Sequence, residues 1–178
     1  MIILATLLSL TLQRVHVQFL PDEAQSVLAI LDTRAAHRAV DDAQWQRLFA
    51  SEGYIRLKKR ELSMKRPLDD AAFREFVLSD ALLAKREMLA RTVADWTSAD
   101  LSHAAALALA YLPANATIYA KVYPVIKPQS NSFVFEVDSD PAIFMNVDDK
   151  PRAEFERTIA HEMHHIGFGT ACASANSP

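Results

Sequence analysis

Several features that would mark a specialised class of protein are missing from this 178-residue chain. Its single cysteine, Cys172, excludes an internal disulfide and leaves the cellular compartment open. Its formal net charge of −3 gives no support for binding nucleic acid or an anionic membrane surface. No internal repeat, low-complexity tract or Gly/Ser linker divides the chain. We therefore predict one domain, large enough to bury a core without disulfides.

A long apolar run is also missing. The first residues, MIILATLLSLTLQ, are fewer than the roughly 20 that a membrane-spanning helix needs, so no stable membrane span is expected. Their length suits the core of a signal peptide, although no Lys or Arg follows Met1 and no A-x-A cleavage site is evident. Residues 1–14 are interpreted as a signal segment or a first strand, and residues 15–178 as the domain. Export to the periplasm or the medium is slightly favoured over the cytoplasm.

Helical spacing dominates the first two thirds of the chain. Pro21-Asp22-Glu23 is a typical helix start, because proline tolerates the first turn and acids favour the positive end of the helix dipole. Further helices are predicted from Asp41-Asp42, with an interruption at Gly53, from Asp69-Asp70 in one long stretch to Trp96, and from Asp100 to Leu112.

After Pro113 the hydrophobic period changes to that of strands. ATIYAKVYPVI alternates, and NSFVFEV and AIFMNV are short β-rich runs separated by the turn-forming Asp138-Ser139-Asp140-Pro141. One last helix follows, with Pro151 in its first turn and Gly167 or Gly169 ending it. The predicted fold class is α+β: N-terminal helices, a short and largely antiparallel sheet, and a terminal helix.

The terminal helix carries the most informative segment, HEMHHIGFG, at residues 161–169. It holds three of the six histidines and two of the three glycines of the chain. At about 100° per residue, His161 and His165 lie about 40° apart, one turn from each other and away from the apolar stripe of the helix. Two imidazoles placed so can bind one Zn²⁺ from a single rigid element.

Glu162 lies beside the two histidines, too far round the helix to be a comfortable third ligand from the same turn. In the metalloprotease arrangement, zinc lowers the pKa of water to about 7 and the adjacent carboxylate takes a proton as water attacks a carbonyl. Glu162 could then pass this proton to the leaving amine. His164 is poorly aimed at the same metal, and His16, His37 and His103 are isolated. The alternative interpretation of the segment is a polar helix face rich in histidine.

Three segments of the chain resemble a known family. SEGYIRLKKRE, ALAYLPANATIYAKVYPVIKPQSNSFVFEVDSDPAIFMNVD and FERTIAHEMHHIGFGTAC are together similar to a bacterial family of zinc-dependent peptidases, first catalogued as a domain of unknown function. Such families are grouped, by the H-E-x-x-H helix, with the gluzincin-like metallopeptidases of zincin-like fold. The resemblance implies that His161 and His165 are zinc ligands and that Glu162 is the catalytic base. By analogy with such enzymes, AIFMNV or NSFVFEV would pair with an extended substrate.

The chain departs from the related patterns in its third ligand. The metzincin position six residues after His165 is Ala171, and no Asp or Glu follows Glu162, whereas gluzincins use a downstream Glu. Catalytic zinc normally has three protein ligands. We therefore expect that the chain is truncated, that the third ligand lies beyond residue 178, and that these 178 residues alone have little or no activity.

Two functions follow. The first is a zinc metallopeptidase that hydrolyses peptide bonds of a peptide or protein substrate. The alternative is a non-catalytic or truncated zincin-like scaffold that binds a partner. The sequence determines neither the substrate preference nor the oligomeric state.

Overall fold

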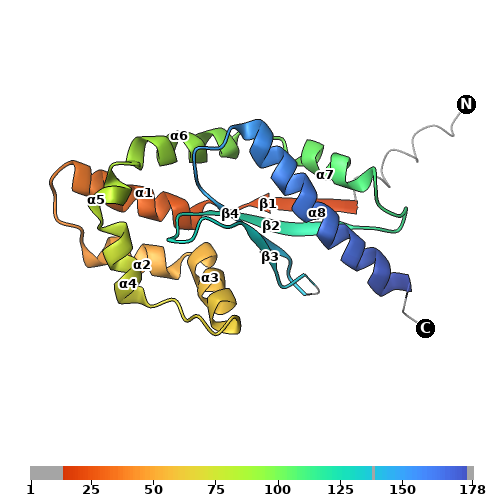
Figure 1. The fold of residues 1–178 in the computed structure, drawn as a ribbon, viewed down its shortest axis with the longest axis horizontal. Coiled ribbons are helices and arrows are strands. Elements are labelled where there is room, and N and C mark those ends of the chain that lie inside the picture. Colours follow the sequence, from red (N-terminus) through yellow and green to blue (C-terminus); the bar gives the residue numbers. More distant parts are fainter. Residues whose placement is uncertain (1–13, 138, 176–178) are drawn as a thin grey trace, which may run out of the picture.

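The computed structural model describes residues 14–137 and 139–175, with side chains through residue 172. Within this part the chain is a mixed α/β structure of eight helices and a four-stranded sheet (Figure 1). The elements are β1 (Val15–Phe19), α1 (Asp22–Ala35), α2 (Asp42–Ala50), α3 (Glu52–Ser63), α4 (Asp70–Val77), α5 (Asp80–Leu83), α6 (Arg86–Thr97), α7 (Leu101–Leu109), β2 (Ile118–Val125), β3 (Phe133–Phe135), β4 (Ala142–Asn146) and α8 (Arg152–Ala175).

The prediction of a signal segment or first strand falls mostly on residues 1–13, outside the described residues. Within the described residues, the first strand is β1, at Val15–Phe19. Among the described helices, none combines the length and the apolar character that crossing a membrane would require.

The sheet is mixed, so the prediction of a largely antiparallel sheet is wrong. Its strand order is β1-β2-β4-β3, in which β1 pairs with β2 and β2 with β4 in parallel, and only β3 and β4 are antiparallel. Parallel neighbours need a long crossover, and the helices α1 to α7 provide it between β1 and β2. Strand β3 lies at the edge, so β4 returns beside β2 in the same direction.

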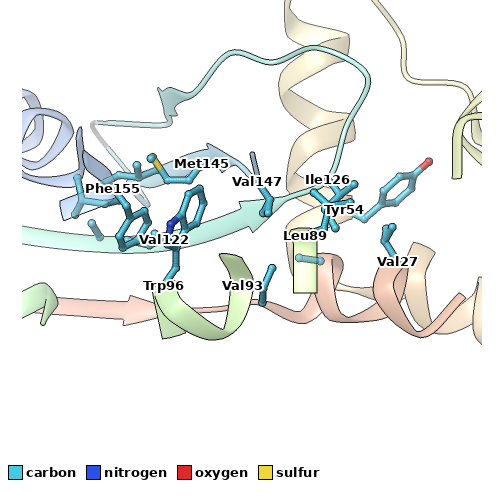
Figure 2. Close-up of a cluster of buried hydrophobic side chains, with 14 of the residues drawn as sticks. Val27, Tyr54, Leu89, Val93, Trp96, Val122, Ile126, Met145, Val147 and Phe155 are labelled. Carbon is cyan, nitrogen blue, oxygen red and sulfur yellow. The ribbon is translucent and has the colours of Figure 1, made fainter. Parts of the chain in front are cut away.

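The two faces of the sheet are covered differently. One face packs against α1, α6, α7 and α8 and forms the main core with side chains such as Val122, Ile143 and Met145. The opposite face packs on α3, where Leu57 lies against Tyr123 and Phe144 in a smaller cluster. Figure 2 shows part of the main core, in which Trp96 of α6 stacks on Phe155 of α8 with 4.5 Å between ring centroids.

Serine and aspartate caps set the helix boundaries more finely than the hydrophobic spacing predicts. Ser51 separates α2 from α3 and accepts a hydrogen bond from the Tyr54 amide, so the break precedes Gly53. Gly53 is instead a site of close packing, because a Cβ there would lie 3.0 Å from Glu23 Cβ. The single helix predicted from Asp69 to Trp96 is divided into α4, α5 and α6, and Ser79 caps α5.

Glu23, in the first turn of α1, is fully buried beneath the end of β2. One carboxylate oxygen accepts the Ile126 amide at 2.9 Å, while the other has no partner among the described residues. Burial raises the pKa of the Glu23 carboxyl to about 8, with a further small contribution from Asp22. Burial also lowers the pKa of the nearby Lys127 ammonium, to about 8. The carboxyl of Glu23 is therefore mostly protonated at neutral pH.

These shifts predict how stability depends on pH. The folded pKa of Glu23 lies above its ordinary value of 4.5, so its contribution to stability is complete below pH 4.5 and is lost as pH rises towards 8. The folded pKa of Lys127 lies below 10.5, so its contribution is complete above that pH and is lost as pH falls towards 8. Together the two groups give a minimum near pH 8.

We expect Glu23→Gln to remove the decline on the acid side of this minimum, because glutamine resembles the protonated carboxyl. Relative to wild type, the variant should gain about 2 to 4 kcal/mol in free energy of unfolding between pH 5 and pH 8. Urea unfolding at several pH values measures this gain. Glu75→Gln is the control, because Glu75 is exposed and undergoes the same chemical change. Parallel pH profiles for wild type and Glu23→Gln would contradict the assignment.

Candidate functional site

The candidate site lies on α8, the longest described helix, which crosses the sheet in Figure 1. Phe155, Ile159, Met163 and Ile166 are completely buried, as their spacing predicts, and hold one side of the helix against the core. This packing fixes the rotation of α8 about its axis. The residues on the opposite side therefore point into solvent.

Neither Gly167 nor Gly169 ends the helix, and that prediction is wrong: α8 continues to Ala175. A Cβ at Gly167 would overlap Leu112 Cδ1 and lie 3.3 Å from Ile118 Cγ1. Gly167 thus allows α8 to approach the end of α7 and the start of β2 closely. Thr170 strengthens this contact, because its hydroxyl donates to the Thr117 carbonyl at 2.9 Å.

His161 and His165 are exposed and converge. Their Nε2 atoms are 3.1 Å apart, and their rings are nearly perpendicular, with 4.6 Å between centroids. Two nitrogens that bind one tetrahedral zinc at about 2.0–2.1 Å are about 3.3 Å from each other. The separation in the structure is close to this value. The two histidines therefore present the donor atoms, the direction and the spacing that a shared zinc ion needs.

Glu162 is half-buried on the same turn and forms no hydrogen bond or ion pair with any described residue. Within the described part of the chain, its carboxylate is thus not engaged in a structural ion pair. His164 is not part of the converging pair: its ring stacks on Phe168, with 6.5 Å between centroids and 15° between planes. Cys172 is exposed, two turns beyond His165.

A third zinc ligand is not evident. Across residues 14–137 and 139–175, no three His, Cys, Asp or Glu side chains are grouped so that they could hold a metal ion. The described residues thus supply two convergent ligands, where a catalytic zinc normally has three from the protein. The fit to zinc is good for the pair and incomplete for the full coordination shell.

The turn between β3 and β4 contacts α8 at Gly169, one helical turn beyond His165. A Cβ at Gly169 would be 3.4 Å from Val137 Cγ1, an ordinary contact distance. On an ideal helix Gly169 is about 40° from His165 and about 20° from Glu162. The segment that follows β3 therefore flanks the side of α8 that carries His165 and Glu162.

Of the two strand segments predicted to pair with substrate, only one has a free edge. AIFMNV contains β4, which is buried throughout and lies between β2 and β3, so it cannot accept another strand. NSFVFEV contains β3, an edge strand paired with β4 alone among the described strands. The structure therefore leaves β3 as the edge that an extended peptide could use.

Tyr119 and Tyr123, the two tyrosines of β2, lie on the other side of the sheet from α8. Tyr123 is completely buried against α3, and its hydroxyl donates to Glu52 at 2.7 Å. Tyr119, four residues before Tyr123, shares that face, and its ring is near His16. Helix α8 packs on the opposite face, so neither side chain is directed towards His161 and His165.

Sequence reasoning missed a second polar group, centred on Arg56. This guanidinium is buried and contacts Tyr123, Glu136 and Asp140. Lys58 and Lys59 follow it closely on the same helix, and nothing in the local spacing separates Arg56 from these two residues. Only the tertiary structure identifies it as the residue that joins α3 to the β3–β4 turn.

Comparisons with known proteins agree with the zinc interpretation at the level of the family. No curated protein and no solved structure matches the chain. Residues 45–175 match the pattern of one protein family, and this stretch contains most of α2, the helices α3 to α7, the strands β2 to β4 and the whole of α8. Because the match covers more than half of the sequence, the chain belongs to the family described as "Putative zinc dependent peptidase (DUF5700)".

Proposed function

We propose that the chain provides the zinc site of a metallopeptidase, in which His161 and His165 bind the metal and Glu162 is the general base. The observation that carries the proposal is the convergence of the two Nε2 atoms, 3.1 Å apart on the exposed side of α8. Membership of the zinc-dependent peptidase family supports it. We place the third protein ligand outside the described residues.

The roles follow from the positions of the side chains. A bound zinc ion would polarise the substrate carbonyl and lower the pKa of a water molecule to about 7. Glu162, one residue after the first ligand, takes the proton from that water as it attacks the carbonyl carbon. The same carboxyl then gives the proton to the amine that leaves, so Glu162 ends the reaction in its starting form.

The substrate is an extended peptide or a protein segment. Among the described strands β3 has one unpaired edge, and the turn that follows it contacts α8 at Gly169, on the side of the helix that carries His165 and Glu162. Main-chain hydrogen bonds along such an edge hold a peptide with little demand on its sequence. The scissile carbonyl would then lie between the edge of β3 and the exposed side of α8.

Metal removal tests the proposal directly. We expect the full-length gene product to hydrolyse an unstructured protein such as casein, to lose this activity on dialysis against a chelator, and to regain it with one equivalent of Zn²⁺. Magnesium should not restore it, because imidazole ligands favour zinc over hard cations. A protein that binds no zinc and cleaves no peptide would instead support the alternative of a non-catalytic scaffold.

A further inference from the structure

Arg56 connects three parts of the molecule that are distant in sequence. It lies on α3, and its side chain is 8% exposed. Nη2 donates to Glu136 Oε2 at 2.9 Å, and Nη1 donates to Asp140 Oδ2 at 2.7 Å and to the Tyr123 hydroxyl at 3.3 Å. The guanidinium also donates to the Asp140 carbonyl. One side chain thus holds both ends of the β3–β4 turn.

The turn depends on this support because its backbone is unfavourable. Glu136 has a φ of 55°, in the left-handed region that residues other than glycine rarely adopt because it strains the backbone. Lys59 is a second cation on the same carboxylate, but it is mostly exposed and contacts only one end of the turn. Arg56 is therefore the residue that fixes both Glu136 and Asp140.

The position of this turn determines where β3 lies relative to α8. Phe135, the last residue of β3, pairs with Ala142, the first residue of β4. This pair closes the turn that contains Glu136 and Asp140, the two residues that Arg56 holds. Val137, inside the turn, faces Gly169 on the side of α8 that carries His165 and Glu162. A shift of the turn would therefore change the position of the free edge of β3 relative to the histidine pair.

We propose that Arg56 is a positioning residue for the substrate: it holds the β3–β4 turn so that the edge of β3 keeps a peptide in register with His161, Glu162 and His165. This inference rests on the proposed function. Arg56 is on the opposite face of the sheet from α8, contacts neither substrate nor metal, and acts through the turn.

The test compares Arg56→Met with Arg34→Met in the full-length protein. Arg34 also ties distant segments together, through Asp80 and the Ser79 carbonyl at 3.1 Å each, but at the junction of α1 and α5. We expect Arg56→Met to raise KM for an octapeptide by about 10-fold or more, with zinc content unchanged, since small misplacements of bound groups are costly. Arg34→Met should leave KM unchanged.

Three further measurements separate positioning from general stability. A short substrate that cannot pair with β3 should be cleaved equally by wild type and Arg56→Met. Arg56→Lys should raise KM less than Arg56→Met does, because one ammonium can hold one carboxylate but cannot hold Glu136 and Asp140 together as the forked guanidinium does. In hydrogen exchange, Arg56→Met should lose protection at Phe133–Phe135 while the amides of α8 stay protected.

If Arg56→Met does not fold, Asp140→Asn takes its place as the test variant. Asp140 is half-exposed, and its replacement should also raise KM.

The possible results distinguish a failure of the proposed function from a failure of the role of Arg56. Zinc-loaded wild type that cleaves no peptide would overturn the proposed function, and the substrate role of Arg56 with it. Active wild type together with an unchanged KM in Arg56→Met or Asp140→Asn would overturn the role of Arg56 alone. Unchanged exchange at β3 would also overturn it, whatever the activity.

Discussion

Glu162→Gln is expected to retain zinc and to lower kcat for peptide hydrolysis by about 10²- to 10⁴-fold, the usual contribution of a positioned general base. Glutamine keeps the size and hydrogen-bonding capacity of the side chain but cannot take a proton from water. KM should change little, because Glu162 is not proposed to bind the peptide in its ground state. Steady-state kinetics on one peptide, with zinc measured on the same samples, provides both quantities.

Glu156→Gln is the matched control for this experiment. Glu156 is a half-buried glutamate on the same helix, and on an ideal helix it lies about 120° from Glu162. Both variants therefore replace a glutamate of α8 by glutamine, but on different sides of the helix. Equal kcat for Glu162→Gln and wild type would remove Glu162 from the mechanism, and a loss of zinc in that variant would make it a ligand instead.

His165→Ala is expected to have the largest effect of all, because it removes one of the two convergent donors. Loss of an outer hydrogen-bonding partner of a zinc ligand costs roughly 10- to 100-fold in affinity, and loss of a ligand itself should cost more. We expect zinc to be lost on dialysis and hydrolysis to fall to background. His161→Ala should behave in the same way, because it removes the other of the two convergent donors.

His164→Ala provides the comparison within the same turn. His164 stacks on Phe168 and does not join the converging pair, so this variant should keep its zinc and most of its activity. Zinc affinity measured against a competing chelator distinguishes the three variants. If His164→Ala loses zinc and His165→Ala retains it, the ligand assignment is wrong.

The parts of the fold that depend on local sequence could be predicted. The start of α1 at Asp22, the three strand segments after Pro113 and the buried stripe Phe155, Ile159, Met163 and Ile166 each follow from spacing and capping within a few residues. The shared side of His161 and His165 follows in the same way, from a separation of four residues. Their actual convergence depends on side-chain rotamers, which spacing does not determine.

The parts that depend on tertiary packing could not be predicted. The sequence indicates three strands after Pro113 but not that β3 takes the edge and places β4 parallel to β2. Gly167 and Gly169 have the composition of a helix end, yet Leu112 and Val137 lie where their side chains would be. The same holds for Arg56, whose partners Glu136 and Asp140 are about 80 residues away.

The most direct test is X-ray absorption spectroscopy of the zinc-loaded full-length protein and its His165→Ala variant. We expect a stoichiometric zinc with two imidazole nitrogens at about 2.0–2.1 Å in wild type, and the loss of one imidazole, or of the zinc itself, in the variant. A zinc with no imidazole among its ligands, or a spectrum that His165→Ala leaves unchanged, would contradict it.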